Sequence, residues 1–171
     1  LNDSKQSTSE NVHDQFVPLG VGHKKRSGRD ITIVGWGNTV SVCEKTADAL
    51  EQVGIESDVI DLRCLTPWDQ QLILSSAEKT ARLIVVHEDN QTCGLGSEIV
   101  ATVAENAKVP VAVRRVTRPD TFIPCNFENQ TEVLPGFKRT LAVAAELLNL
   151  DLDWEEIPVK EAGVEYIEAI G

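Results

Sequence analysis

Methionine is absent from this chain of 171 residues, and aromatic side chains are scarce, at 5% of the total. Because the chain starts with Leu1 and holds no methionine, we expect a fragment of a longer translation product. No apolar run approaches the roughly 20 residues that a membrane-spanning helix needs. We therefore expect no membrane partner.

Closely spaced cysteine pairs are also lacking. The four cysteines are Cys43, Cys64, Cys93 and Cys125. Zinc sites and redox dithiols usually place two cysteines within a few residues of each other, so neither kind of site is expected here. Scattered cysteines fit a reducing compartment, where they pack as small apolar side chains.

Positive charge is in short supply as well. The chain has 16 Lys and Arg against 27 Asp and Glu, and its net charge is −11. Residues 151–171 carry seven of these acidic side chains and a single lysine, so about half of the net charge lies in this short stretch. The basic cluster Lys24-Lys25-Arg26 is too small to line a nucleic-acid groove, and we expect no nucleic-acid partner.

Composition divides the chain into three parts. Residues 1–15 are rich in polar side chains with little to bury, which predicts a disordered segment or linker. Residues 16–150 have the length and apolar content of one domain that buries its own core. Residues 151–171 are expected to form an acidic C-terminal extension.

The domain alternates short β-branched runs with amphipathic stretches, which is typical of a mostly parallel sheet between two helical layers. The expected strands lie at about 21–26, 31–35, 57–62, 82–86 and 111–116, and the expected helices at about 39–53, 66–79, 95–106 and 137–148. Thr66 is the expected N-cap of the second helix, with Pro67 and Asp69 completing the start signal. The proline-rich residues 117–135 are expected to form a long irregular connection.

Polar residues follow the expected strand at 82–86 and reach the edge of the sheet where such folds place functional loops. His87, Glu88 and Asp89 are expected to form a turn there, and adjacent residues at a strand end point in alternate directions. A shared metal site is therefore not expected. Cys93 precedes the next helix, and His87 is its nearest possible partner for thiol activation, but a packed small residue is the simpler interpretation of Cys93.

A nucleotide-binding or regulatory module is one alternative. Gly35-Trp36-Gly37 follows a strand, and Asp61 ends the next strand, which imitates a dinucleotide fingerprint. Val40 occupies the third glycine position, where its side chain would obstruct the close packing of helix on strand. A tight strand-to-helix turn is the simpler interpretation of the two glycines.

Taken together, the motifs resemble one family in their order and spacing, over residues 16–149. The matching segments are Asp61-Leu62-Arg63, Leu65-Thr66-Pro67-Trp68-Asp69, Lys79-Thr80-Ala81-Arg82, Val86-His87-Glu88, Thr92-Cys93-Gly94-Leu95-Gly96-Ser97-Glu98, Pro110-Val111, Arg115-Val116-Thr117 and Asp120-Thr121 with Pro124. That family is the transketolase C-terminal domain. The form most similar is the beta subunit, or the beta half of a fusion, of thiamine-diphosphate-dependent 2-oxoacid dehydrogenases, and the pair His87-Glu88 resembles the branched-chain type (2-oxoisovalerate dehydrogenase).

The resemblance implies a three-layer α/β/α fold with a five-stranded sheet of order 1-3-2-4-5, whose first strand is antiparallel. It implies a whole enzyme that decarboxylates a 2-oxoacid and passes the acyl group to a lipoyl arm. Thiamine diphosphate and Mg²⁺ would be held by parts outside this chain, so no catalytic, cofactor-binding or metal-binding residue is expected in it. The implied location is the cytoplasm of a bacterium or the mitochondrial matrix of a eukaryote.

The implied role of this segment is assembly. Its partners would be the alpha subunit or alpha half, a second beta portion and the lipoyl acyltransferase core. The candidate residues for the interface, or for organising its loops, are His87, Glu88, Phe122, Phe127 and Trp154. The acidic extension is expected to lie along a neighbouring subunit or to recruit a basic partner module. The remaining alternatives are a pyruvate dehydrogenase beta subunit and a domain of a transketolase or deoxyxylulose-phosphate synthase.

Overall fold

The fold was analysed in a computed structural model that describes residues 16–151. The expected linker at 1–15 lies outside the described residues, as does the acidic extension apart from Asp151. The strands are β1 (His23–Arg26), β2 (Ile31–Gly35), β3 (Ser57–Asp61), β4 (Arg82–Asn90) and β5 (Ala112–Arg118). The helices are α1 (Thr39–Gln52), α2 (Gln70–Thr80), α3 (Leu95–Asn106), α4 (Phe127–Val133) and α5 (Phe137–Leu148).

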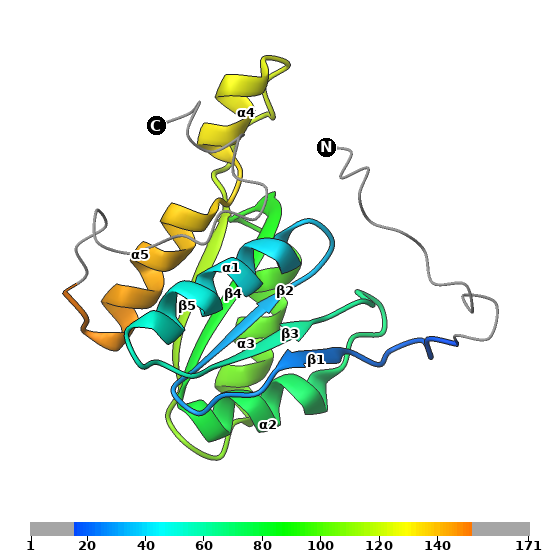
Figure 1. The fold of residues 1–171 in the computed structure, drawn as a ribbon. Helices are drawn as coiled ribbons and strands as arrows, with labels where there is room; N and C mark the ends of the chain where they lie inside the picture. The colour runs from blue at the N-terminus through cyan, green and yellow to red at the C-terminus, as the bar shows by residue number, and fades with distance from the viewer. Residues whose placement is uncertain (1–15, 152–171) are drawn as a thin grey trace.

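The five strands form one sheet of order β1-β3-β2-β4-β5. Strand β1 is antiparallel to β3, and all other neighbours are parallel (Figure 1). This confirms the expected topology. None of the helices between residues 16 and 151 is both long and apolar enough to cross a bilayer.

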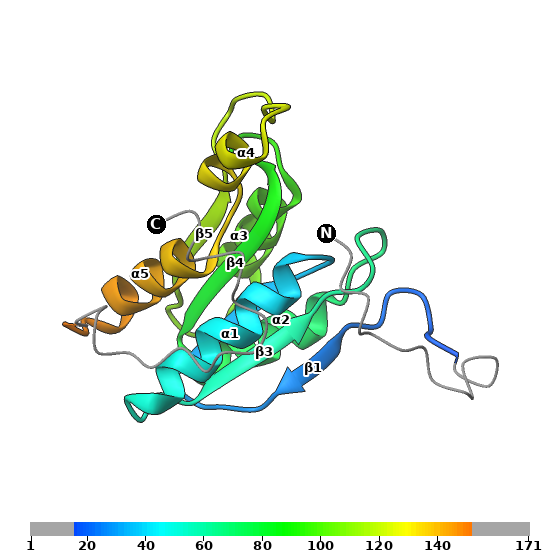
Figure 2. The same cartoon turned by 45° about the horizontal axis from the view of Figure 1, so that its top comes forward.

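Helices cover both faces of the sheet, which makes the expected three layers (Figures 1 and 2). Helices α1 and α5 pack on one face, and α2 and α3 pack on the other. Along β4, Ile84 and Val86 belong to the core beneath α1 and α5, whereas Leu83 and Val85 belong to the core beneath α2 and α3. A strand buried on both faces has no polar side, which is why the sequence shows continuous apolar runs.

The start of α2 differs from the expectation, and the prediction of Thr66 as its N-cap was wrong. Asp69 is the N-cap, and its carboxylate accepts a hydrogen bond from the backbone N–H of Leu72 at 3.0 Å. Its other oxygen accepts the N–H of Gly22 at 3.0 Å. One carboxylate thus accepts from a backbone N–H at the start of α2 and from another in the segment before β1. The contact with Gly22 is tertiary, so the local start signal does not indicate it.

Two further expectations need correction. Strand β4 continues to Asn90, so His87, Glu88 and Asp89 lie in the strand and not in a turn; the pairing of His87 with Thr117 of β5 prolongs it. The connection expected to be irregular contains the short helix α4, whose N-cap Asn126 accepts a hydrogen bond from the N–H of Glu128 at 2.8 Å. An Asn N-cap is a sufficient local start signal even between prolines.

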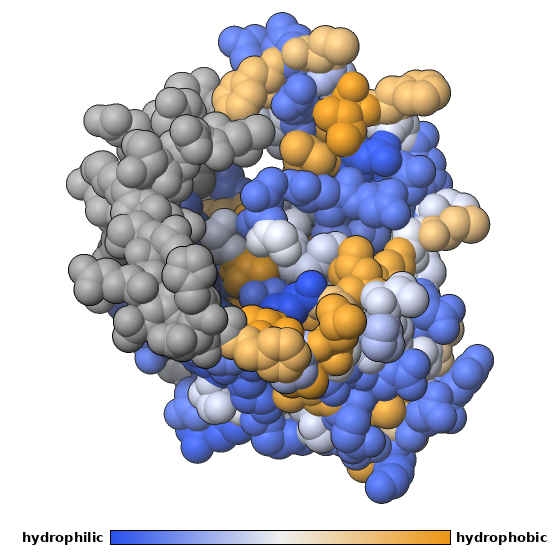
Figure 3. All heavy atoms as spheres, turned by 90° about the vertical axis from the view of Figure 1, so that its right-hand side faces the viewer, coloured by the Kyte–Doolittle hydropathy of each residue, from blue (hydrophilic) through white to orange (hydrophobic). Residues whose placement is uncertain are grey.

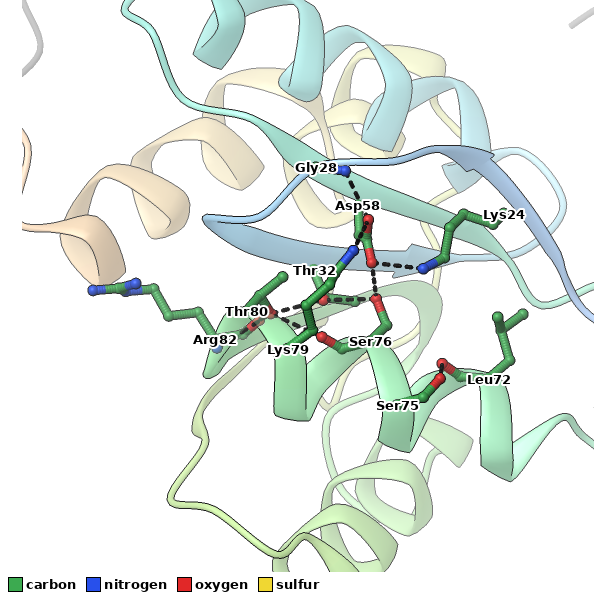
Figure 4. A network of polar contacts seen from close by, with 10 residues as sticks. All are labelled: Lys24, Gly28, Thr32, Asp58, Leu72, Ser75, Ser76, Lys79, Thr80 and Arg82. Atoms are coloured by element: carbon green, nitrogen blue, oxygen red, sulfur yellow. Dashed lines mark hydrogen bonds and ion pairs between the residues drawn. The ribbon is translucent and has the colours of Figure 1, made fainter.

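A polar network fastens α2 to the amino end of the sheet (Figure 4). Its centre is Asp58 of β3, whose side chain is fully buried. One carboxylate oxygen accepts from Lys79 Nζ and from the N–H of Gly28, both at 2.7 Å. The other accepts from Lys24 Nζ at 2.8 Å and from the hydroxyl of Ser76. Four donors therefore converge on one carboxylate.

These contacts set the protonation state of Asp58. Burial alone would raise the pKa of this carboxyl, but hydrogen bonds from Lys24, Lys79, Ser76 and the N–H of Gly28 outweigh burial and hold the pKa below its ordinary value. The carboxylate is thus charged in the folded protein at neutral pH. Because the network lies at the amino end of the strands, away from the edge that carries sites in such sheets, we assign it to stability.

Candidate functional site

Parallel sheets of this kind bind ligands in a crevice where the strand order reverses, at the carboxyl ends of the strands. Here that point lies between β2 and β4. Trp36, directly after β2, stacks on His87 of β4 with ring centroids 5.0 Å apart and an angle of 12° between the rings. This stack lies at the point of the sheet where a nucleotide would be expected to bind.

The glycines on either side of Trp36 form the tight turn that the sequence indicated. Gly37 has φ +57°, a left-handed conformation that favours glycine. A Cβ at Gly35 would lie 2.8 Å from the Sγ of Cys43 and from the Oγ1 of Thr39. Thr39 donates its hydroxyl proton to the backbone oxygen of Val86 at 2.9 Å, which joins α1 to β4.

His87 is fully buried, and no described residue is hydrogen-bonded to either of its ring nitrogens. Helix α3 begins directly over the ring. A Cβ at Gly96 would lie 2.3 Å from Nε2 of His87, and one at Gly94 would lie 2.8 Å from Cε1. The two glycines therefore allow a close approach of α3 to the histidine, which any other residue would prevent.

The surroundings of His87 favour the neutral ring. Burial lowers the pKa of His87; the nearby carboxylate of Asp89 opposes this effect, and the guanidinium of Arg115 adds to it. The net result is a pKa below the ordinary value of histidine. His87 is therefore uncharged at neutral pH.

The neighbours of His87 make no metal or thiolate site. His87 is buried, whereas Glu88 and Asp89 are both exposed, and the pairing of β4 with β5 changes register after His87. Between residues 16 and 151, no three His, Cys, Asp or Glu side chains lie close enough to share a metal ion. Cys93 is exposed and free, so the expectation of a packed side chain was wrong, and no hydrogen bond joins it to His87.

The connection between β4 and α3 is tied to the connection that follows β5. The backbone N–H of Thr92 donates to Asp120 at 2.9 Å, and its hydroxyl donates to the same carboxylate at 2.5 Å. These hydrogen bonds from Thr92 lower the pKa of Asp120. Arg115 of β5 donates to the backbone oxygen of Gln91 at 2.6 Å and to the hydroxyl of Ser97 at 2.5 Å. The two connections are thus joined by side chains.

Apolar side chains lie exposed just beyond Asp120. We call Phe122, Ile123 and Phe127 the apolar rim; their exposed fractions are 93%, 49% and 49%. Figure 3 shows hydrophobic groups on this side of the molecule, some of them at the height of α4, divided by hydrophilic surface. Exposed apolar groups rimmed by polar surface are a feature of protein–protein contact sites.

The structure brings only some of the expected interface residues together. Phe122 and Phe127 lie in the apolar rim, and Glu88 is exposed at the same end of the sheet. His87 is buried inside the domain, and Trp154 lies outside the described residues. That these residues form or organise an interface stays a prediction.

Sequence reasoning missed Trp36, Thr92 and Arg115 as members of this site. The signal for Trp36 was its place between two glycines at a strand end. The pairing of Thr92 with Asp120 spans 28 residues, and no local pattern indicates it.

A groove of about 260 Å³ lies between α3 and β5 and is lined by Gln91, Val100, Val113, Arg114 and Arg115. Its volume is smaller than that of ordinary small-molecule sites, which start at roughly 300 Å³.

Comparison with known families and curated proteins gives consistent matches. Residues 20–135 match the family described as "Transketolase, C-terminal domain". The mitochondrial 2-oxoisovalerate dehydrogenase subunit beta 2 of Arabidopsis thaliana is 39% identical over 117 residues, which are 67% of this chain and 33% of that protein. The pyruvate dehydrogenase E1 component subunit beta of Bacillus subtilis (strain 168) is 37% identical over 134 residues, 77% of this chain and 41% of that protein. The acetoin:2,6-dichlorophenolindophenol oxidoreductase subunit beta of the same bacterium is 35% identical over 134 residues, 77% of this chain and 39% of that protein.

Solved structures show the same fold. A split-gene transketolase, described as an inactive beta4 tetramer, superposes with a TM-score of 0.72 and 26% identity, over 81% of this chain and 46% of that chain. A transketolase from Pichia stipitis superposes with a TM-score of 0.53 at 18% identity, over 75% of this chain and 18% of that chain, and supports the fold alone.

The chain spans about a third to two fifths of the length of the curated relatives that it matches. The match nevertheless covers more than half of this chain, and its relatives are beta subunits of 2-oxoacid dehydrogenases and an acetoin oxidoreductase. The chain belongs to the transketolase C-terminal domain family.

Proposed function

We propose that this chain is the C-terminal assembly domain of the beta subunit, or beta half, of a thiamine-diphosphate-dependent 2-oxoacid dehydrogenase, of the branched-chain type. The whole enzyme decarboxylates a 2-oxoacid and transfers the acyl group to a lipoyl acyltransferase. The chain's partners are the alpha subunit or half, a second beta portion and the acyltransferase core. Its compartment is the bacterial cytoplasm or the mitochondrial matrix, in keeping with four free cysteines.

One observation carries the assembly role. At the carboxyl end of the sheet, Trp36 stacks on His87 where the strand order reverses, and the apolar rim, which follows β5, is exposed. An enzyme site needs a concave space with converging polar groups, whereas an interface needs apolar surface that can be desolvated. The described surface offers such exposed apolar side chains in the apolar rim.

We propose that thiamine diphosphate and Mg²⁺ are held by parts of the enzyme outside this chain, as the family resemblance implies. Mg²⁺ bound to a diphosphate takes one or two protein carboxylates besides phosphate and water oxygens. The carboxylate with the most contacts, Asp58, is buried and fully engaged by Lys24, Lys79, Ser76 and Gly28.

The branched-chain preference rests on the resemblance of the His87-Glu88 segment and on the 39% identity to a 2-oxoisovalerate dehydrogenase beta subunit. Beta subunits for pyruvate and acetoin are similarly related, at 37% and 35% identity. Steady-state assays of the complete enzyme with 2-oxoisovalerate, pyruvate and acetoin decide among them. The highest kcat/KM should be for 2-oxoisovalerate; a higher value for pyruvate or acetoin would reassign the substrate.

The apolar rim should contribute to association of the complete enzyme. Replacing Phe122 and Phe127 by serine together removes two exposed aromatic side chains, and we expect the dissociation constant between the beta portion and its partners to rise at least about tenfold. Analytical ultracentrifugation measures this change. Val53→Ser is the matched control, because Val53 is also exposed, at 43%, but lies at the end of α1, outside the rim. Unchanged association in the double variant would rule out the rim as an interface.

The acidic extension provides a separate test. Deleting residues 151–171 from the full-length protein removes seven acidic side chains and one lysine. If the extension recruits a basic partner module, the affinity for the binding module of the acyltransferase should fall and its dependence on salt concentration should weaken. Isothermal titration calorimetry at two salt concentrations measures both. Equal affinity with and without the extension would contradict this role.

A second candidate is the C-terminal domain of a transketolase, which the superposition on a split-gene transketolase favours. That enzyme class acts on sugar phosphates. Ketol transfer between sugar phosphates by the complete enzyme, without turnover of any 2-oxoacid, would establish this candidate and exclude the dehydrogenase.

A further inference from the structure

His87 is a buried titratable group whose ionisation has no part in the proposed assembly role. Its ring is enclosed on one side by Trp36, at a centroid distance of 5.0 Å, and on another by Gly94 and Gly96 at the start of α3. The exposed fraction of the residue is zero. Neither ring nitrogen has a hydrogen-bond partner among the described residues.

We propose that His87 is an acid-sensitive latch: the neutral ring holds residues 91–97 closed against the sheet, and protonation of the ring releases this segment and loosens the apolar rim that is tied to it. The closed state fits only a neutral ring. The neutral ring has one N–H donor without an acceptor among residues 16–151, whereas an imidazolium would have two and a positive charge. A buried charge without a partner is costly.

The electrostatic surroundings add to this cost. The first turn of α3 lies on the ring, and the positive end of a helix dipole disfavours a cation. From β5, the guanidinium of Arg115 also acts against protonation. From β4, the carboxylate of Asp89 acts in favour of it, but Asp89 is exposed and faces solvent. The contacts from α3 and from the loop after β2 come from Gly94, Gly96 and Trp36, none of which can ionise.

Release of this segment would reach the apolar rim through one contact. Both hydrogen bonds of Thr92 go to Asp120, at 2.9 and 2.5 Å, and Asp120 lies two residues before Phe122. When residues 91–97 move away from His87, the anchor of the 119–127 connection moves with them. Acid would therefore loosen the rim before the sheet itself unfolds.

The expected pH dependence follows from linkage. In the open state His87 has the ordinary histidine pKa of about 6.5, and in the closed state its pKa is lower. Above about 6.5 neither state binds the proton and opening does not depend on pH. Below this value only the open state binds it, so the open population rises about tenfold per pH unit until the closed-state pKa is reached.

Hydrogen exchange of the full 171-residue chain, followed by NMR, tests the latch. Protection factors of the amides in 91–97 should fall about tenfold per pH unit below pH 6.5, while those of β2 stay constant. In His87→Asn, which keeps a neutral planar group of smaller size, the protection factors of 91–97 should not depend on pH. His23→Asn, at an exposed position of β1, is the matched control and should behave as the unmodified chain does.

His87→Phe provides a second non-titrating variant if the asparagine variant fails to fold. The criterion is the slope of protection against pH, so a variant with uniformly weaker protection is still informative. The same slope in a non-titrating variant would overturn the latch. So would a histidine NMR titration in which His87 protonates without any change in the exchange of 91–97.

Discussion

Replacing Asp58 with asparagine should lower the free energy of unfolding by about 3 kcal/mol, because it leaves buried donors without an acceptor. Each carboxylate oxygen accepts two hydrogen bonds. One oxygen accepts from Lys79 and Gly28, and the other accepts from Lys24 and Ser76. An amide places its NH₂ group at one of these positions, where donor faces donor. Chemical denaturation at neutral pH measures the loss.

A loss of this size lies at the lower end for a broken buried ion pair, since both lysines are partly exposed and can turn toward water. Asp48→Asn is the control: Asp48 also pairs with a cation, Arg26, but its side chain is 69% exposed. We expect that variant to change stability by less than about 1 kcal/mol. Equal losses of stability in the two variants would contradict a central role of Asp58 in the network.

The free energies of unfolding of the unmodified chain and of Asp58→Asn should become equal in acid. The folded state lowers the pKa of Asp58 below its unfolded value, which is about 3.9. The stabilisation is therefore fully present above about pH 3.9 and is lost as the pH falls through the folded-state pKa. The stability difference should stay constant from pH 7 to about 4 and shrink below it. A difference that disappeared already between pH 7 and 5 would point to another group.

Gly96→Ala should destabilise the fold by about 2–3 kcal/mol, although alanine is the better helix former by about 1 kcal/mol. The new Cβ would lie 2.3 Å from Nε2 of His87 and 2.7 Å from Cδ2. The ring cannot retreat, because it is buried and stacked on Trp36. The sign of the effect is thus opposite to that expected from helix propensity, and thermal or denaturant unfolding detects it directly.

A double-mutant cycle identifies the cause. With His87→Ala as the background, the clash is gone, and Gly96→Ala should be neutral or stabilising. Gly136→Ala is the positional control, since a Cβ at Gly136 meets nothing within 4 Å and the backbone there is extended. That control should stay within about 1 kcal/mol of the unmodified chain. A Gly96→Ala loss that persists without the histidine would contradict the close packing.

Periodicity was sufficient to predict the strands and four of the five described helices, because burial on both faces leaves a local pattern of apolar residues. The run Leu83 to Val86 is apolar throughout, and the stripe along α5 recurs every three or four residues. Element ends were less predictable. Asp69 displaced Thr66 as the cap of α2 because it also binds Gly22, 47 residues away in the sequence. Strand β4 extended through His87 because β5 offered a pairing partner.

The candidate site, too, could be predicted only in part from the sequence. The apolar residues Phe122 and Phe127 stood out in the sequence because they lie in a proline-rich connection with no helical or strand periodicity to bury them. The role of His87 was not visible there. A histidine before two acidic residues looks like a polar loop, and only the glycines of α3 and the ring of Trp36 make it a buried group.

The sequence by itself determined the alternation of strands and helices, the two-sided burial of the sheet, the acidic character of residues 151–171 and the resemblance to the family. These are properties of residues close together in the sequence, so hydrophobic periodicity and composition indicate them. Only the tertiary structure decided that four donors meet at Asp58, that Trp36 stacks on His87, and that Thr92 holds Asp120. Each of these contacts joins residues far apart in the chain, and long-range contacts depend on packing geometry that no local pattern contains.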